Sequence, residues 1–260
     1  MGALALLAPL VAADDRGWLV RYSPDRVDLV HRLAAPSSEH WLGTDDVGRD
    51  VLSRMIHGSR VSLAVGMTAT AIAVILGCFF GSLAGYYGGA VDWIISRMIE
   101  VVLCFPFLFL LLAVVALFRP SLLTIVIALG LTSWTSEARY VRAEFLRIRE
   151  MEFAQAARAS GAGDLRIIVR HLLPNALAPV LVSASFGVAY AILAESALSF
   201  LGFGVPLPTP SWGGILATAE QFLGYAWWLA VFPGAAIFLT VVAFNIIGDR
   251  VRESMDPTAG

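Results

Sequence analysis

The chain has 260 residues, of which 58% are hydrophobic and 15% are charged. A soluble domain carries about 45–50% apolar and about 25% charged residues, so a soluble fold of this length has too little interior for these side chains. The net charge of −2 excludes a basic nucleic-acid-binding surface. All 18 basic residues are Arg, which excludes a P-loop and a Schiff-base lysine. If ATP is used, another subunit must bind it.

Apolar segments dominate the chain, and several exceed the length of about 18 residues that is typical of a transmembrane helix. The pattern predicts an all-α, polytopic membrane bundle of about six spans. We expect the fourth segment to merge with the polar stretch that follows it, and three prolines (106, 120 and 233) to mark kinks or helix ends. The segments are Ala3–Ala13, Val61–Ala84, Trp93–Phe118, Leu122–Trp134, Asn175–Phe203 and Trp227–Ile247.

The first apolar segment is too short to span a bilayer. Its end, Val11-Ala12-Ala13, is similar to a signal-peptide cleavage site, but no positive charge precedes it. An interfacial segment is the second interpretation. We favour a third, in which the chain begins part-way through a truncated first transmembrane helix. Residues 1–60 are then predicted as a partial first helix with an external segment, and residues 61–260 as the transmembrane domain.

The distribution of Arg predicts the orientation. Residues 139–171 carry seven Arg and residues 204–226 carry none, which places the former in the cytoplasm and the latter outside. Counting back through the spans places residues 85–92 in the cytoplasm and residues 14–60 outside, and the C-terminus is cytoplasmic. Residues 14–60 also contain seven Arg, against this rule. We follow the alternation because all the later spans agree with it.

Small residues recur every four positions in the second segment, a spacing that allows close helix packing in lipid. They are Ala69, Ala73, Gly77, Gly81 and Gly85. This pattern predicts a helix bundle and indicates nothing further about function.

The sequence offers few candidate ligands for a metal. Asp45, Asp46 and Asp50 are carboxylates near one another, but their spacing does not fit an EF-hand, and ion pairs with Arg49 are the simpler interpretation. The four histidines are scattered, which argues against a zinc site. The two cysteines lie in apolar runs and are expected to be small core residues. We therefore predict no metal site and no catalytic residue.

Glu195 lies in the fifth apolar segment, towards its outer end. An ionisable group at membrane depth is costly and is a functional candidate for that reason. It is predicted to line a substrate path, where it could bind a positively charged terminus, to form a buried hydrogen bond with a neighbouring helix, or simply to lie near the lipid headgroups.

A polar stretch before the fifth segment predicts two short helices. Residues 150–160 are rich in good helix formers, and Gly161 and Gly163 are expected to end that helix. Asp164 is expected to cap a second helix, after which Pro174 begins the next span. The small residues 154, 156, 157, 160 and 161 suit a knob that enters a groove of another protein. A solvated loop whose Arg residues only fix the topology is the alternative.

This stretch resembles a known signature. Gln155-Ala156-Ala157, three residues, Gly161, nine residues and then His171-Leu172-Leu173-Pro174 is similar to the Glu-Ala-Ala signature of ABC-importer permeases at every spacing. Gln155 replaces the usual Glu and His171 the usual Ile, which leaves the role of a carboxylate at the first position in doubt. Glu152 could supply one nearby.

Two further stretches resemble the dipeptide/oligopeptide/nickel branch of that family. Residues 40–54 with 58–63 are similar to the entry into its second span. Residues 194–204 with 212–214 are typical of its fifth span and the following loop. The resemblance covers residues 22–257, and members with this external segment are the second of two permease subunits.

The resemblance implies a type I ABC-importer permease fold in a bacterial inner membrane. It implies a homologous second permease, two ABC ATPase subunits that hold ATP and Mg, an external substrate-binding protein, and no cofactor on this chain. The solute would be a peptide, a nickel chelate or a glutathione-like molecule. Residues 150–174 become a coupling loop to the ATPases, with contacts at Glu152, Gln155, Ala156, Ala157, Arg158, Gly161, Leu173 and Pro174.

Two rival classes fit the composition less well. An ion- or proton-coupled secondary transporter needs several intramembrane ionisable groups, and only Glu195, with Arg97 and Glu100 near a span end, qualifies. An intramembrane enzyme is disfavoured because the chain has no Gly-x-Ser-x-Gly motif.

Overall fold

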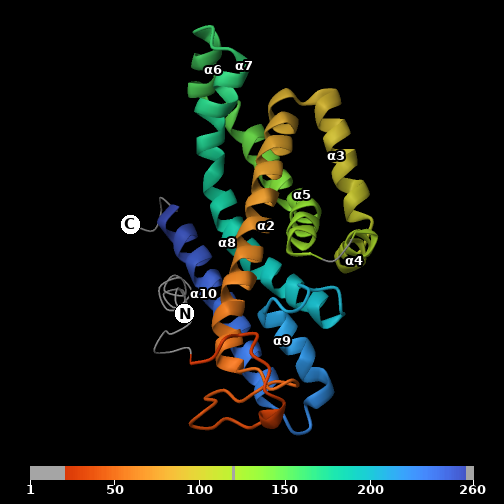
Figure 1. The fold of residues 1–260 in the computed structure, drawn as a ribbon. Coiled ribbons are helices and arrows are strands. Elements are labelled where there is room, and N and C mark those ends of the chain that lie inside the picture. Colours follow the sequence, from red (N-terminus) through yellow and green to blue (C-terminus); the bar gives the residue numbers. More distant parts are fainter. Residues whose placement is uncertain (1–20, 119–120, 256–260) are drawn as a thin grey trace. The chain divides into compact units, whose positions relative to one another are not determined.

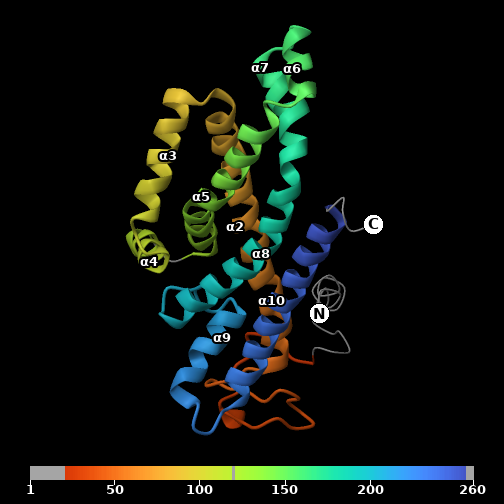
Figure 2. The same ribbon diagram turned by 180° about the vertical axis from the view of Figure 1, so that it is seen from behind.

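The structure is a computed structural model that describes residues 21–118 and 121–255. The described residues are mostly helical, as predicted, and they contain no β-strand beyond one isolated bridge between Thr44 and Asp50. Figure 1 and Figure 2 show these helices from opposite sides. The apolar segment at residues 3–13 and Pro120 lie outside the described residues.

Long helices alternate with short ones along the chain. The short 3-10 and π-helical elements are η1 (Leu29–His31), η2 (Ile167–Leu172) and η3 (Glu220–Phe222). The α-helices are α2 (Val51–Tyr87), α3 (Gly89–Leu103), α4 (Phe107–Leu117), α5 (Leu122–Ile148), α6 (Glu152–Ala159), α7 (Asp164–Arg166), α8 (Leu173–Phe200), α9 (Trp212–Ala219) and α10 (Trp228–Met255).

Three described stretches are long and apolar enough to cross a membrane: α2, the continuous helix from Asp164 to Phe200, and α10 up to Ser254. The pair α3 and α4 adds a fourth if it counts as one span. α5 runs unbroken from its apolar start into charged residues, as predicted for the fourth segment. Pro233 lies in the second turn of α10 without ending it.

The third apolar segment is broken. The stretch predicted from Trp93 to Phe118 is divided into α3, which ends at Leu103, and α4, which leaves it at an angle of 87°, and the kink or helix end expected at Pro106 is confirmed. Pro106 explains the break: it has no N–H to continue the helix, and its ring disfavours helical backbone in the preceding residue. Cys104 is exposed at this bend, whereas Cys78 packs against a core as expected; both are free thiols.

The chain divides into two compact units, each assembled from separate segments. Of the described residues, one unit contains those up to Met67 and those in Val114–Val126 and Val188–Phe244. The other contains Thr68–Ala113, Ile127–Gly187 and the described residues from Asn245 onwards. We call them the first and the second unit.

Within the second unit, the small-residue face of α2 packs against α5. An added Cβ would lie 2.3 Å from Cβ of Glu137 at Gly77, 2.5 Å from the carbonyl oxygen of Ala138 at Gly81, and 2.5 Å from Cβ of Phe145 at Gly85. Only glycine allows the two backbones to approach this closely. The predicted stripe is therefore a helix-packing surface.

Within the first unit, two tryptophans connect distant segments. Trp212 at the start of α9 donates from Nε1 to the carbonyl of Met55, 3.0 Å away, and from its backbone N–H to Oγ of Ser62, 3.1 Å away. Trp228 at the start of α10 donates to the carbonyl of Thr44, 3.0 Å away. The bonds of Trp212 connect α9 to α2, and the bond of Trp228 connects α10 to the segment before α2.

Candidate functional site

The predicted coupling loop, residues 150–174, forms a knob between α5 and α8 in the second unit, seen at one end of these helices in both views (Figures 1 and 2). Its base is apolar. Ala154 of α6 is fully buried, and it belongs to one core cluster with Phe145 and Ile148 of α5 and with Ile167 and Leu172 of η2. The cluster holds the knob on the helices that carry it.

The turn inside the knob follows the predicted glycine. Gly161 has a φ of +77° and follows α6, and the next N–H, that of Ala162, bonds to the carbonyl of Ala157 over 3.1 Å. This is the glycine-terminated helix end expected from the sequence. An added Cβ at Gly161 or Gly163 would meet nothing within 4 Å. The turn is therefore open to another protein.

The role predicted for Asp164 was wrong. It is the first residue of α7 rather than its cap, and Gly163 takes the capping position without a side-chain bond. The Asp164 carboxylate instead accepts a hydrogen bond from the hydroxyl of Tyr86, 2.7 Å away. The guanidinium of Arg158 lies over the Tyr86 ring, 5.5 Å from its centroid. Tyr86, at the end of α2, thus joins both sides of the turn, and no sequence pattern pointed to it.

The second predicted short helix is not separate. α7 and the π-helical η2 lead directly into α8, so that one continuous helix runs from Asp164 to Phe200. Pro174 is the second residue of α8 rather than the start of a new element. The knob is therefore continuous with the first turns of α8.

Most predicted contact residues lie on the surface of the knob. Ala157 and Leu173 are half-buried, and the exposed ones are Glu152, Gln155, Ala156, Arg158, Gly161 and Pro174. Sequence reasoning missed four exposed apolar neighbours in the knob, which are Met151, Phe153 (40% exposed), Leu165 (74% exposed) and Val169. Apolar residues within an otherwise polar stretch are the sequence signal that could have identified them, because exposed apolar side chains often mark an interaction site.

Local hydrogen bonds hold the first helix of the knob. Gln155, which replaces the usual carboxylate, donates from Nε2 to the carbonyl of Glu150 over 3.0 Å. Arg149 donates to the carbonyl of Gly85 over 2.9 Å and so fixes the end of α5 against α2. An amide suits the position of Gln155 because the bond requires a donor.

Glu195 of α8 is fully buried in the first unit. Its Oε1 accepts hydrogen bonds from the hydroxyls of Ser199, 2.8 Å away, and Ser211, 2.9 Å away. Ser211 in turn accepts from the N–H of Gly214 and caps α9. This is the buried hydrogen bond that the sequence offered as the second role of Glu195. A role of Glu195 in a substrate path stays a prediction.

The acidic cluster before α2 forms ion pairs. Nε of Arg49 lies 2.6 Å from Oδ2 of Asp45, and Arg54 approaches the same carboxylate at 3.6 Å. Asp50 pairs with His40, with 2.9 Å between Oδ2 and Nδ1. The simpler interpretation of this cluster is therefore confirmed. Two of the seven Arg that opposed the predicted orientation are neutralised within the fold.

Comparisons with known proteins agree with the signature. Residues 73–259 match the family described as binding-protein-dependent transport system inner membrane component. The chain is 42% identical to the dipeptide transport system permease protein DppC of Alkalihalophilus pseudofirmus, covering 98% of this chain and 81% of the relative. It is 40% identical to the glutathione transport system permease protein GsiD of Pectobacterium atrosepticum, covering 92% and 80%.

Solved structures support the same fold. The MetNI methionine ABC transporter in an inward-facing conformation matches with a TM-score of 0.64 at 19% identity, over 77% of this chain and 95% of that one. An amino acid ABC transporter matches with a TM-score of 0.56. The helical architecture is that of a type I ABC-importer permease. The chain belongs to the binding-protein-dependent transport system inner membrane component family and is a permease subunit of an ABC importer, with a role in transport rather than catalysis.

Proposed function

We propose that this chain forms one half of a peptide translocation path in a bacterial inner membrane. The observation that carries the proposal is its similarity, over 98% of its length, to a dipeptide permease. A probable D,D-dipeptide permease of Escherichia coli and a glutathione permease are similar at 40% identity. All three names point to small peptide-like solutes. A nickel chelate stays an alternative without support from these relatives.

A homologous second permease, two ABC ATPases and an external binding protein complete the proposed complex. ATP and Mg belong to the ATPases, since this chain has no Lys for a P-loop. The knob faces the cytoplasm and docks on an ATPase through its exposed residues, including Phe153 and Leu165. The six Arg in residues 142–170 support this orientation, which places the C-terminus in the cytoplasm.

The first test is to purify the tagged chain from its host in mild detergent and to identify co-purifying proteins by mass spectrometry. A second permease and P-loop ATPases are expected, and a binding protein among them would indicate the solute. Recovery of the chain alone, while a control transporter stays assembled, would contradict the proposal. Uptake should be abolished by vanadate and should persist when an uncoupler collapses the proton gradient.

A further inference from the structure

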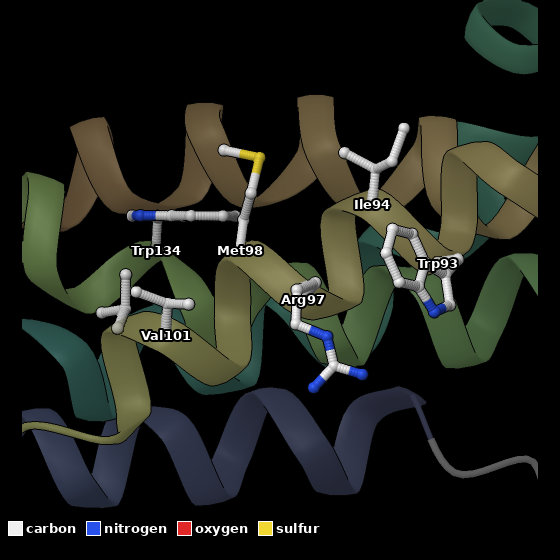
Figure 3. Close-up of a pocket in the computed structure, with 7 residues that line it drawn as sticks. Trp93, Ile94, Arg97, Met98, Val101 and Trp134 are labelled. Carbon is white, nitrogen blue, oxygen red and sulfur yellow. The ribbon is translucent and has the colours of Figure 1, made fainter.

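The neighbouring helices α3 and α5 of the second unit differ in the polarity of their exposed side chains. α3 carries an open groove of about 420 Å³ whose lining is almost entirely apolar, with Trp93, Ile94, Met98 and Val101 beside Trp134 of α5 (Figure 3). These side chains suit the hydrocarbon region of a bilayer.

The exposed side of α5 is polar just beyond Trp134, whereas the groove on α3 is lined by apolar side chains and by Arg97. Ser136, Arg139 and Tyr140 are all exposed, and we call them the α5 polar face. Trp134 of the same helix lines the groove on α3, and it precedes Ser136 by two residues and Arg139 by five. The α5 polar face therefore begins within about two helical turns of the apolar groove.

The exposed arginines of α3 and α5 also differ in their contacts. On α3, Arg97 pairs with Glu100, and its guanidinium lies 5.8 Å from the centroid of Trp93 (Figure 3). On α5, no carboxylate or aromatic ring of the described residues contacts Arg139 in this way, although it is exposed. Ionisable side chains at membrane depth mostly face a water-filled cavity or the interior of a bundle, where they mark substrate pathways.

We propose that the α5 polar face lines the aqueous path for the solute, and that Arg139 binds the carboxylate of the passing peptide. This inference rests on the proposed function and adds to it a contact residue and a ligand group. A peptide carries a terminal carboxylate that is ionised at neutral pH. The planar guanidinium can donate two parallel hydrogen bonds to it. The hydroxyls of Ser136 and Tyr140 supply further polar contacts.

The position of the α5 polar face can be tested by thiol labelling of the complete importer in inside-out vesicles. Cys78 is first replaced by Ala and Cys104 by Ser, and solute uptake by this cysteine-free parent is verified. Ser136→Cys is then compared with Met98→Cys, using a charged, membrane-impermeant maleimide. We expect Ser136→Cys to react at least about tenfold faster, because thiolate and reagent meet only in water.

The carboxylate contact is tested with dialanine and dialanine amide, added at millimolar concentration to the same vesicles. Dialanine should slow labelling of the Ser136→Cys variant at least about threefold, and the amide should not, because it lacks the charge that Arg139 recognises. Adding Arg139→Gln should remove the protection, Arg139→Lys should retain part of it, and the matched control Arg97→Gln should leave it unchanged.

Three results would overturn the inference: equal labelling of both thiols, equal protection by the acid and the amide, or a crosslink from Ser136→Cys to the second permease that replaces labelling. Labelling that changes only with anionic lipid content would assign Arg139 to a phosphate headgroup instead. A vanadate-insensitive uptake in the unmodified complex would reject the proposed function itself, so the two failures are distinguishable.

Discussion

Glycine serves opposite purposes in two parts of the second unit. On α2, an added Cβ at Gly81 would lie 2.5 Å from a carbonyl oxygen of α5. In the knob, an added Cβ at Gly161 would meet nothing within 4 Å, and this residue is required for its φ of +77°. The first glycine allows two helices of this chain to touch, and the second lies in open space on the surface that we propose docks on an ATPase. Folding and the proposed coupling therefore depend on different small residues.

The largest effect on folding is expected at the α2–α5 contact. Gly81→Ala should destabilise the subunit by about 2–3 kcal/mol, because the new methyl group forces backbone shifts in a packed interface. The measurement is thermal unfolding of the purified complex, together with the abundance of the subunit in membranes.

Gly234→Ala is the matched control for that variant. Gly234 lies inside α10, and an added Cβ there meets nothing within 4 Å. The higher helix propensity of Ala should leave stability unchanged or raise it by up to about 1 kcal/mol. If Gly81→Ala proved as stable as Gly234→Ala, the close contact between α2 and α5 would be incorrect.

The largest effect on transport without loss of folding is expected in the knob. Gly161→Asp should reduce ATP-dependent uptake to background while the amount of subunit stays close to normal. The left-handed backbone costs a non-glycine residue only about 1–2 kcal/mol. The added carboxylate lies on the surface that we assign to the ATPase. Uptake at matched expression is the measurement.

Gly202→Asp controls for backbone strain. Gly202 follows α8 with a φ of +83°, has open space around it, and precedes a residue whose N–H bonds to Leu198 over 2.8 Å. It repeats the geometry of Gly161 outside the knob. We expect this variant to retain uptake. Equal loss in both variants would show that strain, and not docking, explains the phenotype.

A smaller effect is expected at Tyr86. Tyr86→Phe removes the hydroxyl that bonds to Asp164 and keeps the ring beneath Arg158. A single exposed hydrogen bond contributes about 0.5–1.5 kcal/mol, so we expect the ATP hydrolysed per solute to rise by no more than a few-fold. Tyr87→Phe, one residue along, should have no effect. A normal ratio in Tyr86→Phe would mean that the turn needs no bond to α2.

The sequence predicted those features that depend on local patterns. The four-residue period of small residues indicated a packed face of α2, and Gly161 was correctly expected to end a helix. The bend between α3 and α4 was underestimated because hydropathy does not register the direction of the chain at Pro106. Asp164 was misassigned because its partner, Tyr86, lies 78 residues away in the sequence.

The candidate site was predictable in outline for a similar reason. Spacing placed the knob, whereas the outward direction of Phe153 and Leu165 depends on which side of each helix packs against the core. Arg139 looked like any other Arg of a cytoplasmic loop. Trp134, five residues before it on α5, lines the apolar groove on α3 and shows that Arg139 lies close to an apolar segment.

The smallest effect is expected at an exposed ion pair, because exposed groups should matter little for folding. Asp28 accepts from His31 over 2.9 Å. This bond raises the pKa of His31 above its ordinary 6.5 and lowers the pKa of Asp28 below its ordinary 3.8. The contribution of His31 is present below pH 6.5 and is lost as the pH rises through its folded pKa; that of Asp28 is lost on acidification.

The wild-type complex should therefore exceed the His31→Gln variant in melting temperature by at most about 1 °C at pH 5.5, and by nothing measurable at pH 8.5. Asp28→Asn should show the same pattern, because either substitution removes the pair. A difference that grew with pH would reverse the sign of this linkage. A difference of many degrees in melting temperature would show that this exposed contact stabilises the fold. That result would contradict the expectation that buried contacts, and not exposed ones, determine the stability of this chain.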